Sequence, residues 1–231
     1  MEAKVLNALQ ASVLTILFEH GIGERGYYFT GGSALAEFYL QHRYSEDLDL
    51  FTRSAQPIRS DYADFKPLLA SKGLEIIASE ESQEFVRFFV QEHGKSSGAL
   101  KIEFARDAGA QLSPFKFFEK IAVDSFEDIA VNKVCAILGR EPSEPKDFAD
   151  LYFILQESTF TLDYLLQRAK EKEAAFDRED GFLFFATNLL KVKDFHLLPR
   201  MIKPLSLEDL RSFLLPKAEA IIRRLRPARR S

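Results

Sequence analysis

The chain changes character near residue 125, and this change limits the folds that it can adopt. Before that point, short β-prone runs alternate with helical segments, whereas every later apolar pattern has the spacing of a helix. The predicted strands are 27–30, 48–51, 74–78, 85–91, 100–105 and 120–123; the predicted helices are 3–20, 34–40, 61–71, 125–138, 146–157, 161–172, 179–192 and 206–225, the last interrupted by Pro216. We therefore expect an α/β (α+β) fold: a mixed sheet flanked by helices over residues 1–124, with an appended all-helical domain over residues 125–231.

The composition excludes several other classes of protein. Hydrophobic residues make up 46% and charged residues 29% of the 231 residues, which excludes a disordered chain. No apolar run is long enough for a membrane-spanning helix, and the N-terminus has the pattern of an amphipathic helix rather than a signal peptide, so we expect a cytoplasmic protein. Cys135 is the single cysteine, which excludes a disulfide framework within the chain and a Cys-rich zinc site. Its apolar helical surroundings predict a core thiol without a redox role.

Two glycines and a serine lie between a predicted strand and a predicted helix. At Gly31 and Gly32 the absence of Cβ lets a ligand approach the backbone closely. Ser33 begins the helix, where a hydroxyl and free N–H groups favour an anion. Such a tripeptide is common in loops, so by itself it is weak evidence for a phosphate site.

Acidic residues on two predicted strands give a second signal. Asp47 and Asp49 are two residues apart, so their carboxylates face the same side, and their repulsion is relieved by a hard cation such as Mg²⁺ or Mn²⁺. The alternative is an exposed strand edge with alternating charges. The alternation also puts Lys101 and Glu103 on one face of their strand. If the two strands pair, Glu103 completes a three-carboxylate cluster suited to two-metal transfer of a nucleotidyl group.

These residues lie in a run, GGSALAEFYLQHRYSEDLDLF (residues 31–51), that resembles the signature of the AbiEii/AbiGii-type nucleotidyltransferases. Members of that family are toxins of abortive-infection and toxin–antitoxin systems, within the polymerase-β-like nucleotidyltransferase superfamily. The resemblance continues in DIAVNK (128–133), then in Arg140 followed by KDFADLY (146–152). One departure is the spacer of 13 residues between Ser33 and Asp47, which is at the long end for the superfamily.

The resemblance implies a role for individual residues. Gly32 and Ser33 match the motif that contacts nucleotide phosphates, Asp47 and Asp49 match the metal-binding pair, and Lys133 matches a lysine that approaches the phosphates. The metal ligands expected are Asp47, Asp49 and Glu103, the last placed by strand alternation; the catalytic residues expected are Asp47, Asp49, Lys133 and Asp150, and the nucleotide-binding residues are Gly32, Ser33, Arg43, Lys133, Lys146 and Asp147.

Several of these residues also have a simpler interpretation. Lys133 could extend to the surface from an otherwise apolar helix face. Asp147 could stabilise the N-terminus of its helix, which leaves open whether Asp147 or Asp150 is the later essential aspartate. Arg43 could pair with Asp47 or Asp49, and Lys146 could neutralise neighbouring acids.

The activity that the resemblance implies is transfer of a nucleoside monophosphate from an NTP to an acceptor hydroxyl, with Mg²⁺ or Mn²⁺ as cofactor. The active site is expected in the cleft between the two domains, the favoured acceptor is the 3′ end of tRNA, and a cognate antitoxin is an implied partner. Six basic residues against one acid over 217–231 are compatible with RNA, or with a solvated terminus. The alternatives are a nucleotidyltransferase acting on a small molecule or a protein, and a non-catalytic nucleotide-binding module.

Overall fold

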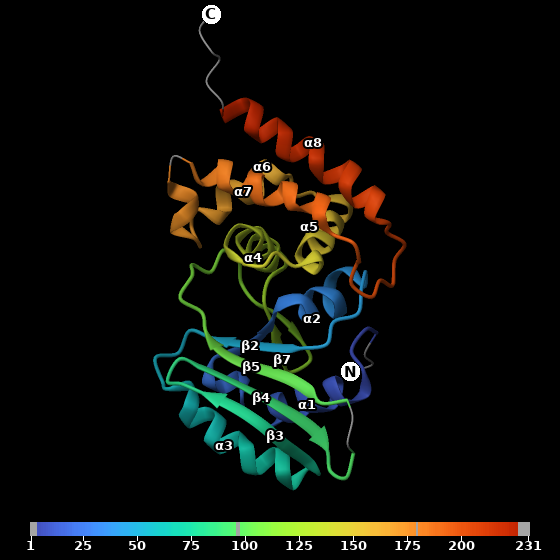
Figure 1. Cartoon of the computed structure of the whole chain (residues 1–231). Coiled ribbons are helices and arrows are strands. Elements are labelled where there is room, and N and C mark those ends of the chain that lie inside the picture. Colours follow the sequence, from blue (N-terminus) through green and yellow to red (C-terminus); the bar gives the residue numbers. More distant parts are fainter. Residues whose placement is uncertain (1–3, 96–97, 179, 226–231) are drawn as a thin grey trace, which may run out of the picture. The chain divides into compact units, whose positions relative to one another are not determined.

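The structure is a computed structural model that describes residues 4–95, 98–178 and 180–225 (Figure 1). The chain forms two compact units: unit 1 comprises Met1–Ala108 and Ser113–Phe126, and unit 2 comprises Gly109–Leu112 and Glu127–Ser231. Unit 1 combines a sheet with helices and unit 2 is helical, so the predicted α/β fold with C-terminal helices is confirmed.

Unit 1 is built on a seven-stranded mixed sheet with the strand order β3-β4-β5-β2-β1-β7-β6. The parallel pairs are β2 with β5 and β1 with β7, and the other neighbours are antiparallel. The strands are β1 (Tyr27–Thr30), β2 (Leu48–Thr52), β3 (Leu74–Glu81), β4 (Phe85–Glu92), β5 (Leu100–Arg106), β6 (Lys116–Phe118) and β7 (Ile121–Val123). The helical segments are α1 (Ala8–Glu19), a 3₁₀ turn (Gly23–Arg25), α2 (Gly31–Leu35), a π-helical turn (Ala36–Leu40) and α3 (Ile58–Ser71).

The central strands separate an apolar face from a polar one. Alternate residues of β2, β4 and β5 are buried, as the period of a strand requires. On the buried face, the ring of Tyr62 from α3 lies 4.9 Å from that of Phe88, which in turn lies 5.2 Å from Phe104. The intervening residues of β2 and β5 include Asp49 and Glu103, so the opposite face of the sheet carries the polar groups.

The first helix begins later than its apolar pattern predicts. Instead of extending the helix, the backbone N–H groups of Lys4, Val5 and Leu6 donate to the buried carboxylate of Glu37. Asn7 then caps α1 by accepting from the N–H of Gln10 at 2.9 Å. Residues 4–7 are therefore not helical, although the sequence pattern predicted a helix there. The predicted first residue of that helix, residue 3, lies outside the described residues.

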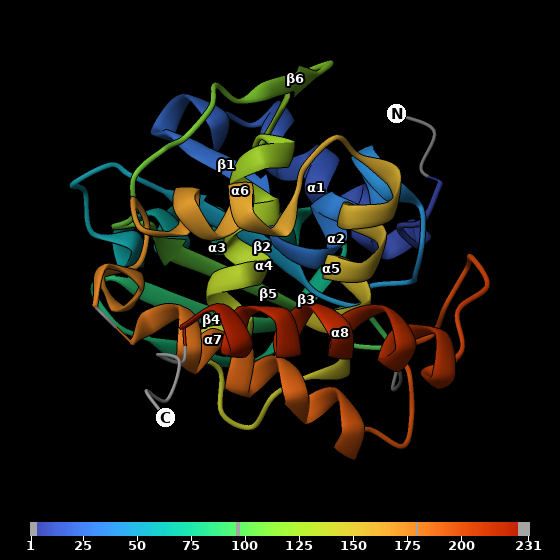
Figure 2. The ribbon, with the colours of Figure 1, turned by 90° about the horizontal axis from the view of Figure 1, so that it is seen from above.

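Unit 2 contains most of α4 (Phe126–Gly139), α5 (Pro145–Glu157), α6 (Leu162–Ala169), α7 (Gly181–Leu189) and α8 (Leu207–Leu225), with 3₁₀ turns at Ala174–Asp177 and Leu190–Asp194. Figure 2 shows α8 lying along α7, with which it packs. The predicted interruption at Pro216 is wrong, because α8 is one helix. Pro216 and Ser212 are both exposed, so water can solvate the carbonyl that the missing N–H leaves free.

Within the described ranges, no helix is both long and apolar enough to cross a membrane. Of the predicted basic tail, Arg226, Arg229 and Arg230 lie outside the described residues. Arg224, at the end of α8, pairs with Asp163 at 3.0 Å.

Candidate functional site

The two acidic strands are neighbours, as the hypothesis of a carboxylate cluster required. β2 and β5 pair in parallel, and Asp49 lies in register with Glu103. Side chains of such a pair project from the same face of the sheet. Asp47, however, comes one residue before β2 rather than inside it, so its carboxylate is placed by the loop as well as by the sheet.

Two cations from adjacent strands lie among these acids. The ammonium of Lys101 is 2.8 Å from Oδ2 of Asp47 and 3.2 Å from Oε1 of Glu103. Nε of Arg87, from β4, donates to the same Oε1 at 2.8 Å. Burial lowers the pKa of Lys101, but its contacts with Asp47 and Glu103 outweigh that effect and raise the pKa above its ordinary value. Burial likewise raises the pKa of Glu103, yet Arg87 and Lys101 bring it below its ordinary value, so both groups are charged near neutral pH.

The absence of a Cβ at Gly31 and Gly32 leaves room for two side chains of this protein. Gly31 has φ = +74°, and a Cβ there would collide with the carboxylate of Asp49. A Cβ at Gly32 would collide with the guanidinium of Arg43, which is buried and donates to the carbonyl of Tyr44 at 3.0 Å. The sequence predicted close approach of a ligand to these glycines. In the structure the approaching groups are Asp49 and Arg43.

Ser33 connects the glycine turn to the acidic strand. Ser33 is buried, and its hydroxyl donates a short hydrogen bond to the backbone carbonyl of Asp47. In this arrangement the hydroxyl holds the main chain just before β2. Ser33 therefore positions Asp47, in addition to lying at the start of α2, where the expected phosphate contact would be made.

Buried polar groups outside the predicted site residues support the same turn. The hydroxyl of Thr30, the last residue of β1, donates to the buried carboxylate of Asp124 at 2.8 Å. The hydroxyl of Tyr39 donates to the backbone carbonyl of Asp124 at 2.7 Å, which connects the π-helical turn to the residue after β7. An acid directly after a short apolar strand was a weak signal for Asp124, and Glu37 had no signal beyond its place in a helix.

Unit 2 contains a second, more deeply buried charge cluster. The ammonium of Lys133, on α4, is 3.0 Å from Asp147 and 2.8 Å from Asp150, which lie three residues apart on α5. Arg140 also pairs with Asp147, at 2.5 Å. Both carboxylates are almost fully buried, and the Lys133 side chain is 9% exposed, so the interpretation of Lys133 as a lysine that extends to the surface is wrong.

Lys146 lies apart from these buried pairs. Its ammonium is 2.7 Å from Glu144 and its side chain is 36% exposed. Its neighbour Glu144 also contacts Arg140, at 3.4 Å. Arg140 and Lys146 are thus the more accessible cations of this part of unit 2, while Lys133 is the buried one.

The acidic residues of unit 1 suit a hard divalent cation, although their three carboxylates are not arranged as a three-ligand metal site. Across the described residues, no three His, Cys, Asp or Glu side chains are grouped as a metal site. Asp47 and Asp49 nonetheless offer carboxylate oxygens, and Mg²⁺ is commonly held by one or two carboxylates together with substrate phosphates and water. Asp47 and Glu103 both contact Lys101, and Glu103 also contacts Arg87.

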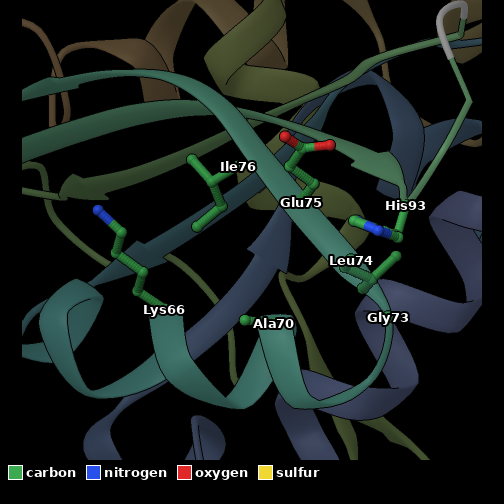
Figure 3. Close-up of a pocket in the computed structure, with 7 residues that line it drawn as sticks. All are labelled: Lys66, Ala70, Gly73, Leu74, Glu75, Ile76 and His93. Atoms are coloured by element: carbon green, nitrogen blue, oxygen red, sulfur yellow. The ribbon is translucent and has the colours of Figure 1, made fainter.

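A hollow of about 330 Å³ lies between α3 and β3. Figure 3 shows Lys66 rising from α3, with Glu75 on β3 and His93 after β4. None of the catalytic, nucleotide-binding or metal-binding residues predicted from the sequence lines it. We therefore do not assign the reaction to this hollow.

Comparison with known proteins agrees with this geometry. The profile of the family described as "Nucleotidyl transferase AbiEii toxin, Type IV TA system" matches residues 14–229. A comparison with curated proteins finds no match. Among solved structures, a Helicobacter pylori protein proposed to be a nucleotidyltransferase is similar (TM-score 0.59, 21% identity, covering 94% of this chain and 96% of that one). JHP933, also from H. pylori, has a TM-score of 0.56 and 22% identity, with 94% and 93% covered.

The nucleotidyltransferase toxin MenT4 of Mycobacterium tuberculosis is similar as well, with a TM-score of 0.56 and 13% identity over 92% of this chain and 82% of that one. At these identities the structural likeness establishes the fold. The family match covers nearly the whole sequence and includes both charge clusters. The chain therefore belongs to the AbiEii family of nucleotidyltransferase toxins.

Proposed function

We propose that this nucleotidyltransferase transfers a nucleoside monophosphate from an NTP to a hydroxyl of RNA, with the 3′ end of tRNA as the favoured acceptor and Mg²⁺ or Mn²⁺ as cofactor. The observation that carries the proposal is the fit between the Gly31–Ser33 turn and the two aspartates, in which Gly31 accommodates Asp49 and Ser33 holds Asp47. A turn that offers N–H groups to phosphate is thereby joined to the carboxylates that would bind a cation.

The reaction exchanges the phosphoanhydride bond of the α-phosphorus for a phosphoester bond. The acceptor oxygen forms a bond to this phosphorus, the bond to the pyrophosphate oxygen breaks, and the acceptor proton leaves to the solvent. A divalent ion, when bound, supplies positive charge near the phosphate oxygens. Asp47 and Asp49 would hold that ion, with Gly32 and Ser33 at the phosphates.

The cations of unit 2 would serve the triphosphate. The ammonium of Lys133 is held in place by Asp147 and Asp150. We assign the role of the later essential aspartate to Asp150, because its 2.8 Å contact orients the ammonium. Asp147 is shared between Lys133 and Arg140. Lys146 and Arg140 are accessible enough to meet an incoming nucleotide, and the guanidinium of Arg43 lies against the glycine turn at Gly32.

The family description also names a type IV toxin–antitoxin system, so we propose that an antitoxin opposes this activity in the cell.

The test is label transfer. Purified chain is incubated with Mg²⁺, total tRNA and each α-labelled NTP in turn, beside the variants Asp49→Asn and Asp64→Asn. Asp64 is a matched control, because it is an exposed aspartate of α3 whose partner is Arg25. We expect label on tRNA with the wild type and with Asp64→Asn, and a loss of at least about a hundredfold with Asp49→Asn, the order expected when electrostatic stabilisation of the transition state is removed.

Other outcomes redirect the proposal. Label on the protein alone would identify a protein side chain as acceptor. No label on either, from folded protein with metal present, would reject tRNA as the acceptor and favour a small-molecule acceptor or a non-catalytic nucleotide-binding role.

A further inference from the structure

We propose that Gln10, on α1, is a positioning residue of the acidic site, whose side-chain amide fixes the backbone that carries Asp47. This inference rests on the proposed function, since Asp47 is one of the two aspartates proposed to hold the divalent ion. Gln10 lies before the part of the chain that the family profile matches, which begins at residue 14.

The backbone that leads into β2 has no regular secondary structure of its own. Residues 44–47 belong to no helix or strand, so their carbonyls need partners other than a ladder of backbone hydrogen bonds. The carbonyls of Tyr44, Ser45 and Asp47 each accept a hydrogen bond from a side chain; the donors, in the same order, are Arg43 at 3.0 Å, Gln10 at 2.8 Å and the hydroxyl of Ser33. Gln10 thus acts on this segment in the same way as two residues that the resemblance assigned to nucleotide binding.

Gln10 occupies a helix position that would suit an apolar side chain. It is 1% exposed and shares the buried face of α1 with Val13 and Leu14. A buried amide costs free energy unless its polar atoms are hydrogen-bonded. In Gln10 both atoms are bonded, because Oε1 accepts from the N–H of Asn7 at 2.9 Å while Nε2 donates to the carbonyl of Ser45. The amide is therefore held at both of its polar atoms in the orientation that reaches Ser45.

The chain just before α1 is itself bound to the spacer between Ser33 and Asp47. The buried carboxylate of Glu37 accepts from the N–H of Val5 at 2.7 Å and from that of Leu6 at 2.9 Å. Glu37 lies in the π-helical turn, in the first half of the spacer. The N-terminal residues therefore hold the spacer at two points, Glu37 and Ser45.

Ser45 also lies against the glycine turn, so a shift at Ser45 would be felt there. A Cβ at Gly32 would come within 3.3 Å of the Ser45 hydroxyl. Asp47 follows only two residues later, and its own carbonyl is held by Ser33. Without the amide of Gln10, the carbonyl of Ser45 loses this donor and the backbone before Asp47 becomes freer to move. A displacement of about 1 Å at a reacting group can lower a rate by about a hundredfold.

Gln10→Met tests this role, because it keeps the length of the side chain, suits the apolar face of α1 and removes the donor. Hydrogen exchange of the full chain, followed by mass spectrometry, reports on the backbone without relying on activity. We expect the amides of residues 44–48 to exchange at least about fivefold faster than in the wild type, because local opening becomes easier. Gln10→Leu is a second replacement without a donor, and it should give the same result.

Binding of Mn²⁺ without nucleotide, followed by electron paramagnetic resonance, reports on the site itself. We expect Gln10→Met to bind Mn²⁺ at least about threefold more weakly, because Asp47 is no longer held in place. Asn7→Ala is the matched control: it removes the cap on the N–H of Gln10 and so weakens the same end of α1, but it leaves the amide of Gln10 on Ser45. Its exchange at residues 44–48 and its Mn²⁺ affinity should equal those of the wild type. Near-ultraviolet circular dichroism checks that each variant is folded.

Three results would overturn the inference. Exchange at residues 44–48 could be unchanged in Gln10→Met and Gln10→Leu, which would mean that the amide does not hold the segment. Exchange could rise while Mn²⁺ affinity stays the same, which would make Gln10 a structural partner only. Asn7→Ala could match Gln10→Met in both measurements, which would assign the effect to the stability of α1.

The proposed function fails separately. The expected exchange and Mn²⁺ results, with a wild type that transfers no label, would reject the proposed reaction and support the role of Gln10. A wild type that transfers label but binds no Mn²⁺ would overturn this inference together with the proposed role of Asp47.

Discussion

Replacing Lys133 with methionine should cost more stability than the loss of any surface ion pair of unit 2. The substitution keeps the length of the side chain but removes an ammonium that lies within 3.0 Å of Asp147 and 2.8 Å of Asp150. Both carboxylates would then lie buried without that charge, because their side chains are 1% and 0% exposed. Asp147 would keep its contact with Arg140.

The magnitude follows from the distances and the burial. Coulomb's law with an effective dielectric constant of about 20 gives roughly 6 kcal/mol of attraction for unit charges 2.8 Å apart, as for Lys133 and Asp150. Desolvation of both ions offsets part of this attraction. Measured losses for breaking one partner of a buried pair are about 3–5 kcal/mol, and we expect a value in that range.

Urea denaturation followed by circular dichroism gives the free energy of unfolding. Lys146→Met is the control, because it also removes a lysine from a 2.7 Å ion pair, but the side chain is 36% exposed. Its cost should be below about 1 kcal/mol, as for surface pairs generally. In the double variant Lys133→Met/Asp150→Asn, which removes the stranded charge as well, part of the loss should be recovered. If Lys133→Met and Lys146→Met lowered the free energy of unfolding equally, burial would not explain the strength of the Lys133 ion pairs.

Two further predictions test the glycine turn and the single thiol. Gly31 and Gly73 share nearly the same backbone (φ = +74° and +77°), so alanine at either should cost about 1–2 kcal/mol in backbone strain. Only at Gly31 does the new Cβ meet Asp49, so only Gly31→Ala should also lose label transfer, and equal loss in Gly73→Ala would contradict this reasoning. Burial raises the pKa of Cys135 from 9.0 to about 12, so at pH 8 the folded chain should react with a thiol reagent about a thousandfold more slowly than the urea-unfolded chain, and equal rates would refute it.

The strand pattern of the acidic site could be predicted from the sequence because its physical basis is local. Alternation along residues 100–105 identified the polar face of β5, and the pairing of Asp49 with Glu103 comes from the register in which β2 and β5 pair in the structure. The same alternation already put Lys101 beside Glu103. Arg87 could not be predicted, because its contact depends on the register in which β4 pairs with β5.

The cluster of unit 2 was less accessible to such reasoning. The spacing of Asp147 and Asp150 on α5 predicts that they share a helix face, but not which residue of another helix meets that face. Burial of Lys133 depends on how α4 and α5 pack, and helix propensity carries no information on this. From the helix pattern alone, Lys133 could have extended to the surface, whereas in the structure two carboxylates hold it in the interior.

The long spacer between Ser33 and Asp47 is explained by how its two ends meet. The glycine turn and the acidic strand are joined directly, by the hydroxyl of Ser33 on the carbonyl of Asp47 and by the carboxylate of Asp49 against Gly31. The intervening residues include the π-helical turn Ala36–Leu40, which accommodates more residues than a regular helix of the same length, and Gln10 of α1 donates to the spacer at Ser45. Because loop closure costs little for a few added residues, the length of the spacer can vary while the junction stays the same. It is the junction, rather than the spacing along the sequence, that places the two aspartates beside the turn.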